Sequence, residues 1–91
     1  MGTNAYIITY DVANSEDFDY GDLMKAIKAY GVWAHITEST WAVVTDEAAS
    51  TIANYLLGFM PENSRVFVVR SGSEATWSNV ICRDSWLKKR L

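Results

Sequence analysis

The sequence predicts an α+β domain in which four short strands and two helices form one layered unit. Apolar residues fill four short segments rich in β-branched and aromatic side chains, which is typical of strands. They recur at three- and four-residue spacing along two longer segments, which is typical of amphipathic helices. Because a chain of 91 residues can build only one core, we expect a single domain over 1–91, with its core at about 4–70 and a C-terminal tail over 71–91.

The first strand is predicted over Ala5–Val12, where both alternating sets of side chains are apolar. A strand of this kind is expected to be buried on both faces. The segment 13–19 is polar and lacks a repeat, so it is predicted to be a loop. Ser15 or Asp19 in this loop is expected to cap the helix that follows.

The first helix is predicted over Tyr20–Tyr30, because its apolar residues form one stripe and Gly31 is a typical helix stop. Two short strands follow, at Val32–Thr37 and Thr40–Thr45. Only two residues separate them, so they are predicted to form a hairpin.

The second helix is predicted over Asp46–Phe59, with acidic residues at its start, where they suit the helix dipole. The last strand is predicted over Ser64–Arg70, again with apolar side chains in both alternating sets and therefore covered on both sides. Helix-like spacing from Trp86 to Leu91 predicts a short C-terminal helix.

The order of the first six elements, β-α-β-β-α-β, predicts a ferredoxin-like sandwich, in which both helices cover one face of a four-stranded antiparallel sheet. The opposite face then needs a cover, because a bare apolar patch of several hundred square ångströms is unusual. Either a second copy of the chain, packed about a two-fold axis, or the folded-back tail is expected to supply it.

Composition limits the functions to consider. The net charge of −3 gives no support to a general affinity for duplex nucleic acid. The single cysteine, Cys82, excludes an internal disulfide framework and is typical of a reducing compartment. The apolar run at 5–10 is too short to span a bilayer, and no basic segment precedes it. We therefore expect a cytoplasmic protein without an export signal or a membrane partner.

Several short motifs occur in a characteristic order: Tyr10-Asp11-Val12, Ala26-Ile27-Lys28, Gly31 to His35, and Ser39-Thr40-Trp41. In this order they resemble the small CRISPR-associated adaptation proteins of the Cas-two family, especially its SinR-like relatives. The VapD-type toxin ribonucleases belong to the same wider superfamily. The resemblance covers about residues 5–70 and implies a ferredoxin-like homodimer.

The resemblance also implies a role for Asp11, which matches the family's metal-binding aspartate. In a metal-dependent nuclease, the two copies of Asp11 in a dimer would bind one Mg²⁺ or Mn²⁺ ion. Apart from the resemblance, the position of Asp11 at a strand end predicts that its side chain caps the following turn. The chain departs from the family at Asn14-Ser15-Glu16-Asp17, where the adaptation proteins carry basic residues.

Two functions follow from these observations. The acidic charge favours a Cas-two-like dimeric module that associates with nucleic acid or binds a protein. The alternative is a weak metal-dependent endonuclease acting on RNA or DNA, with paired Asp11 at the dimer interface. For the module, the nucleic-acid or partner contacts are expected in the tail, with an exposed tryptophan and a group of basic residues: Trp77, Arg83, Lys88, Lys89 and Arg90.

Two further residues are assigned structural roles. Trp41 is predicted to pack in the core or at a dimer interface, because large aromatic rings fill both. His35, the only histidine, is predicted to be a half-exposed strand residue without a catalytic role. The sequence contains no glycine-rich phosphate-binding fingerprint.

Overall fold

The computed structural model describes residues 2–72 and 74–91. Over these residues the chain is an α+β protein with one four-stranded antiparallel sheet and three α-helices, which is compatible with a ferredoxin-like fold. The strands lie in the order β2-β3-β1-β4. In chain order the strands and α-helices are β1 (Asn4–Asp11), α1 (Gly21–Lys28), β2 (Val32–Thr37), β3 (Thr40–Thr45), α2 (Ala49–Leu57), β4 (Arg65–Arg70) and α3 (Asp84–Arg90).

The two hairpin strands begin and end where the sequence predicts, whereas the first two helices are shorter than predicted and the C-terminal helix begins two residues earlier. After α1, Gly31 has a φ of 91°, a left-handed conformation that suits glycine. The expected acidic start of the second helix is wrong: Asp46 and Glu47 precede α2, because Ala48 is extended and serves as the N-cap. None of the helices in the described residues has the length and apolar character needed to cross a bilayer.

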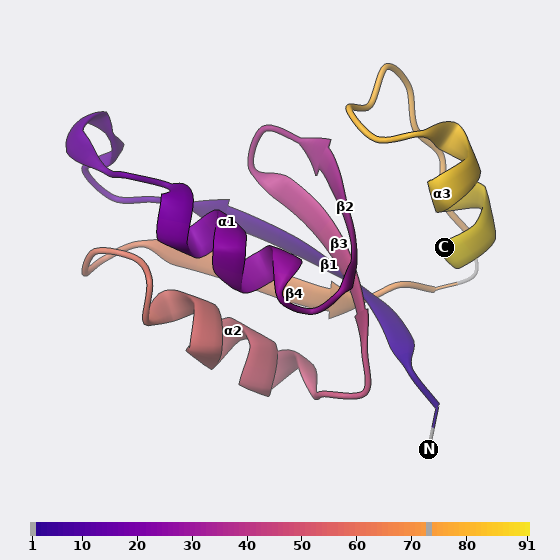
Figure 1. The fold of residues 1–91 in the computed structure, drawn as a ribbon, viewed down its shortest axis with the longest axis horizontal. Coiled ribbons are helices and arrows are strands. Elements are labelled where there is room, and N and C mark those ends of the chain that lie inside the picture. The colour runs from indigo at the N-terminus through magenta and orange to yellow at the C-terminus, as the bar shows by residue number, and fades with distance from the viewer. Residues whose placement is uncertain (1, 73) are drawn as a thin grey trace.

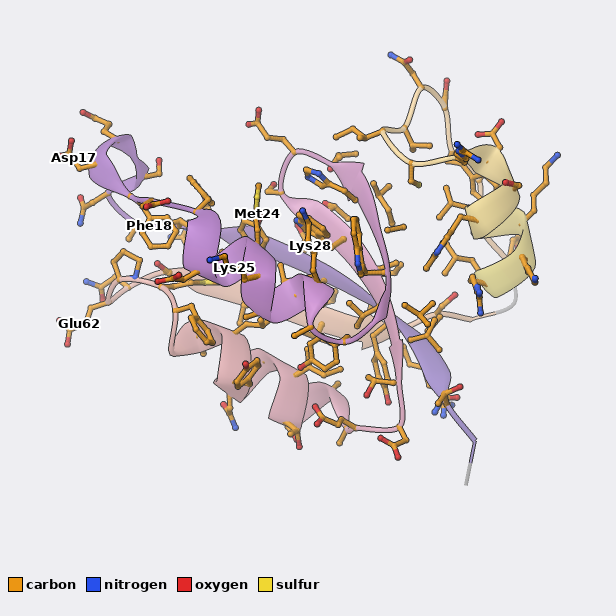
Figure 2. The ribbon with its side chains drawn as sticks, in the orientation of Figure 1. Asp17, Phe18, Met24, Lys25, Lys28 and Glu62 are labelled. Carbon is orange, nitrogen blue, oxygen red and sulfur yellow. The ribbon has the colours of Figure 1, made fainter. Side chains whose placement is uncertain are left out.

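The loop between β1 and α1 contains local structure that the sequence analysis does not predict. It contains a 3₁₀ turn over Ser15–Asp17, and Phe18 packs edge-on against Tyr20 with ring centroids 4.8 Å apart. The backbone N–H of Gly21 donates to Asp19 Oδ1 at 2.9 Å, so Asp19 satisfies one of the free donors at the start of α1, as predicted. In Figure 2 Asp17 and Phe18 lie at this end of the molecule, far from α3.

The main core lies between the sheet and the pair α1 and α2, which cover the same face (Figure 1). Ile8 is paired with Trp41 on one side and Val68 on the other, so all three side chains point to this face. Trp41 is 1% exposed, which confirms that it is a core residue. The fully buried side chains of this core come from both layers: Ile8, Leu23, Ile27, Trp41, Val43, Ile52 and Leu56.

The C-terminal segment lies on the other side of β2 and β3 from α1 and α2 (Figure 1). Its backbone joins the edge of the sheet, where the N–H of Ile81 donates to the carbonyl of Ile36 at 2.8 Å. Leu87 of α3 is fully buried, yet it lies outside the main core, as do the buried Ala34 and Ala42. We interpret these three residues as a small second core beneath α3.

The remaining half of this face is open within one chain, so the folded-back tail, one of the two covers that the sequence predicts, does not cover β1 and β4. Phe67 is 61% exposed and Val69 43% exposed, and Ile7 is only half-buried. Ile7 and Val69 are paired across β1 and β4, with Phe67 two residues along the same strand. The tail covers the β2 and β3 half of the face and leaves these side chains bare.

Candidate functional site

Asp11 lies at the end of β1 and its side chain is 73% exposed. Its partner in the adjacent strand is Arg65, whose Nη1 donates to Asp11 Oδ2 at 3.2 Å. The predicted role of Asp11 as a turn cap is wrong, since the backbone N–H of Ala13 donates instead to Ser64 Oγ at 3.0 Å. Asp11 is therefore one half of a surface ion pair.

The side chains around Asp11 that could bind a metal ion are too few for a complete metal site within one chain. A hollow of about 530 Å³ adjoins Asp11 and is also lined by Glu38, Tyr10 and Tyr20. Among the described residues, however, no three histidine, cysteine or acidic side chains are grouped so that they would hold a metal ion. Mg²⁺ is usually bound by one or two carboxylates together with water and substrate phosphate. Asp11 offers one carboxylate, already paired with Arg65, and Glu38 is the one other carboxylate of the described lining.

His35 has a structural environment. Its ring stacks on that of Trp41 with centroids 4.0 Å apart and planes 9° from parallel. Its Nε2 lies 3.1 Å from the carbonyl oxygen of Glu38, and since a carbonyl only accepts, Nε2 carries the proton in this contact. His35 is half-buried, as predicted, and its hydrogen bond to Glu38 stabilises the turn of the β2–β3 hairpin.

Beneath His35, a buried hydrogen bond joins β3 to β1: Trp41 Nε1 donates to the hydroxyl of Tyr10 at 3.1 Å. Burial raises the pKa of Tyr10 above its ordinary value of 10.0. The hydroxyl therefore stays protonated at neutral pH and acts here as an acceptor.

The five tail residues predicted as contacts do not form one cluster. Arg83, Lys89 and Arg90 line a groove of about 740 Å³ between the C-terminal segment and β2. Lys88 is exposed but lies outside this lining. Trp77, predicted to be exposed, is half-buried, and its Nε1 donates to Asp84 Oδ1 at 3.2 Å.

Sequence reasoning missed the other residues of this groove. Trp33 and Ala34 contribute from β2, and Ile81, Cys82 and Trp86 from the tail. Their meeting depends on where the tail crosses β2, and no motif in the sequence marks that crossing. Burial raises the pKa of the Cys82 thiol, and the negative charge of Asp84 acts in the same direction. Cys82 is therefore protonated at neutral pH, unlike a reactive thiolate.

The sequence matches no protein-family model and no curated protein, and the fold matches no solved structure.

Proposed function

We propose that the chain is a Cas-two-like homodimeric binding module with a ferredoxin-like βαββαβ fold. It works in the cytoplasm, as a binding protein and not as an efficient enzyme. The order of the first six elements and the antiparallel sheet support this choice of fold. Of the two kinds of partner expected for such a module, a protein suits the open sheet face better, because that face is apolar at its centre.

The observation that carries the proposal is the apolar patch formed by Ile7, Phe67 and Val69 on β1 and β4. Phe67 and Val69 are among the few large apolar side chains that are clearly exposed in the described residues. Aromatic side chains are enriched at the centres of protein interfaces, while charged residues are found at the rim. Asp11 and Arg65 flank the patch at the end of the same two strands, so the surface has this arrangement.

A second copy of the chain is the partner that we infer. A two-fold interface brings the same patch of both subunits together, so it requires a surface that is complementary to itself. A patch with an apolar centre and one residue of each charge at its edge meets this requirement, because Asp11 of one protomer can approach Arg65 of the other. Burial of Phe67 would then remove a large apolar area from water.

The test is the oligomeric state measured by sedimentation velocity over a range of concentrations. The wild-type chain is expected to sediment as a dimer. Phe67→Thr, which keeps a residue suited to a strand, is expected to shift it to monomer. Leu57→Gln, at an exposed apolar position on α2, is the matched control and should remain dimeric. A wild-type chain that is monomeric at every concentration would refute the proposal.

The alternative is a weak metal-dependent endonuclease for RNA or DNA. One observation favours it: Asp11 is exposed and lies on the same strand pair as the apolar patch, so dimerisation there would bring a second Asp11 to the interface. Two carboxylates are a usual complement for Mg²⁺ or Mn²⁺, which would activate water for attack on a phosphodiester.

Cleavage of labelled RNA and DNA in Mg²⁺ or Mn²⁺ tests this alternative. A nuclease would lose activity on Asp11→Asn but keep it on Glu38→Gln, a change in the same hollow. If Asp11→Asn cleaves as well as the wild type, the activity does not belong to this site.

A further inference from the structure

The groove between β2 and the C-terminal segment concentrates positive charge in an acidic chain. Three of the eight lysines and arginines line it, namely Arg83, Lys89 and Arg90, while the chain as a whole carries a net charge of −3. The described lining contains no aspartate or glutamate. Asp84 is adjacent in sequence and its negative charge acts on Cys82 of the lining, but it offsets only one of the three positive charges. The charge of the groove therefore favours an anion.

The same groove contains flat aromatic surface. Trp86 is half-buried, and the guanidinium of Arg90 lies 5.9 Å from the centre of its ring. Trp33 also adjoins the groove, but its ring packs against the main core, and Nζ of Lys28 in α1 lies 5.1 Å from the centre of that ring. In Figure 2 Lys28 projects from the end of α1 that is nearer β2. Because the ring of Trp33 packs against the main core and that of Trp86 does not, Trp86 is the better surface for stacking.

The groove also has the size and the walls of a small-molecule site. Its volume of about 740 Å³ falls within the usual range for ligand pockets, which is roughly 300–1,000 Å³. One wall is the β2 edge strand, which is fixed by the sheet. The other is α3, which is held by the buried Leu87. Ile81, 61% exposed, adds an apolar side chain between the two.

We propose that this groove binds a nucleotide, with its base stacked on Trp86 and its phosphate held by Arg83 and Lys89. A nucleotide joins a flat aromatic ring to an anion, and these are the two chemistries that the groove offers together. Bases stack on aromatic side chains without regard to sequence, and basic residues hold the phosphate. The nucleotide is either a free mononucleotide or one unit of a single strand. The proposal goes beyond protein binding and does not depend on self-association at Phe67.

The primary test is a pair of titrations of the full chain, one with AMP by calorimetry and one with a short fluorescein-labelled oligo-dT strand by anisotropy. Binding of either probe is expected. AMP bound as tightly as the strand identifies a free nucleotide as the ligand, whereas clearly tighter binding of the strand identifies a single strand. If neither probe binds at millimolar concentration, the proposal is wrong.

Two variants distinguish binding in the groove from general electrostatic attraction of the ligand to basic residues. Arg83→Gln combined with Lys89→Gln is expected to weaken binding by roughly tenfold or more, because it removes charged hydrogen-bond donors to phosphate. Lys88→Gln removes a positive charge from the same helix but outside the lining, so it should change affinity less than about twofold. Equal losses in the two proteins would overturn the proposal.

Two competitors of AMP and one spectrum test the chemical class of the ligand. Inorganic phosphate should compete far less well than AMP, since it has no base to stack. An acidic peptide should also compete weakly. If either matches AMP, the groove does not recognise a nucleotide. In wild-type protein labelled with ¹⁵N, AMP should shift the indole signal of Trp86 and leave that of the buried Trp41 in place. The reverse pattern would contradict the site.

Discussion

Arg65 and Asp11 face each other across β4 and β1, with Arg65 Nη1 3.2 Å from Asp11 Oδ2, and both side chains are largely exposed, at 83% and 73%. They are 54 residues apart in sequence. Water and salt screen such a pair strongly, so it adds little to stability. Its importance lies in its position, at the edge of the apolar patch formed by Ile7, Phe67 and Val69.

Asp11→Asn is therefore expected to leave the fold intact. Because exposed ion pairs contribute about 0–1 kcal/mol, the free energy of unfolding should change by less than about 1 kcal/mol. Urea denaturation followed by circular dichroism measures this change. A loss well above that range would mean that Asp11 supports the fold, and cleavage assays on Asp11→Asn would then need a different variant.

The hydrogen bond between Trp41 Nε1 and the Tyr10 hydroxyl gives a second prediction. Tyr10→Phe leaves the buried indole N–H without its acceptor, which should cost about 1–3 kcal/mol of unfolding free energy. Tyr6→Phe is the matched control, since Tyr6 is equally buried and its hydroxyl bonds to nothing within the described residues. Equal losses in the two proteins would show that the hydrogen bond itself contributes nothing.

Local patterns explain which parts of the fold were predictable. The hairpin strands and the burial of Trp41 follow from the period of two and from the short connection, both properties of neighbouring residues. The position of α2 was less predictable. Asp46 and Glu47 suit a helix start, yet the chain is still extended at Ala48. Helix ends depend on such backbone details more than on composition.

The parts of the surface that matter for function depend on contacts between distant segments. An exposed Phe67 and a buried apolar strand residue look the same in sequence, because only the position of the tail decides which half of the sheet is covered. The pairing of Arg65 with Asp11 needs the β1–β4 register, and the groove at Trp86 needs the tail placed against β2. Spacing along the chain contains none of this information. The sequence-based hypotheses for Asp11 therefore did not include its ion-pair partner, Arg65.

Tyr30 gives a prediction about alkaline pH. Burial, with the negative charge of Glu47 acting in the same direction, raises its pKa from 10.0 to about 12. Between these values the unfolded chain releases the tyrosine proton while the folded chain retains it. The stabilisation is thus complete below pH 10 and is lost as the pH rises toward 12, so the free energy of unfolding should fall over this range.

Tyr30→Phe should flatten this pH dependence, because it removes the titrating group. The hydroxyl of Tyr30 is buried without a hydrogen-bond partner in the described structure, so its removal should be neutral or slightly stabilising at pH 7. Urea midpoints of both proteins, measured from pH 7 to pH 11.5, test the two statements. Parallel curves for the two proteins would show that another group controls alkaline unfolding.

Leu87 gives the last prediction, since it is the one buried residue of α3. Replacing a buried leucine by alanine usually costs about 2–5 kcal/mol. Here the cost should appear as local opening, because Leu87 lies outside the main core and α3 is joined to the sheet through a short contact at Ile36. In Leu87→Ala, amide hydrogen exchange should therefore quicken across α3 while the amides of β1 keep their protection.

Lys88→Ala is the control for this experiment, because Lys88 is exposed on the same helix. It should leave exchange across α3 close to that of the wild type. If Leu87→Ala instead weakens protection equally in β1 and α3, the C-terminal segment unfolds together with the main core. A locally opened α3 has a further consequence: one wall of the groove is lost, so Leu87→Ala should also abolish AMP binding while the dimer formed through Phe67 persists.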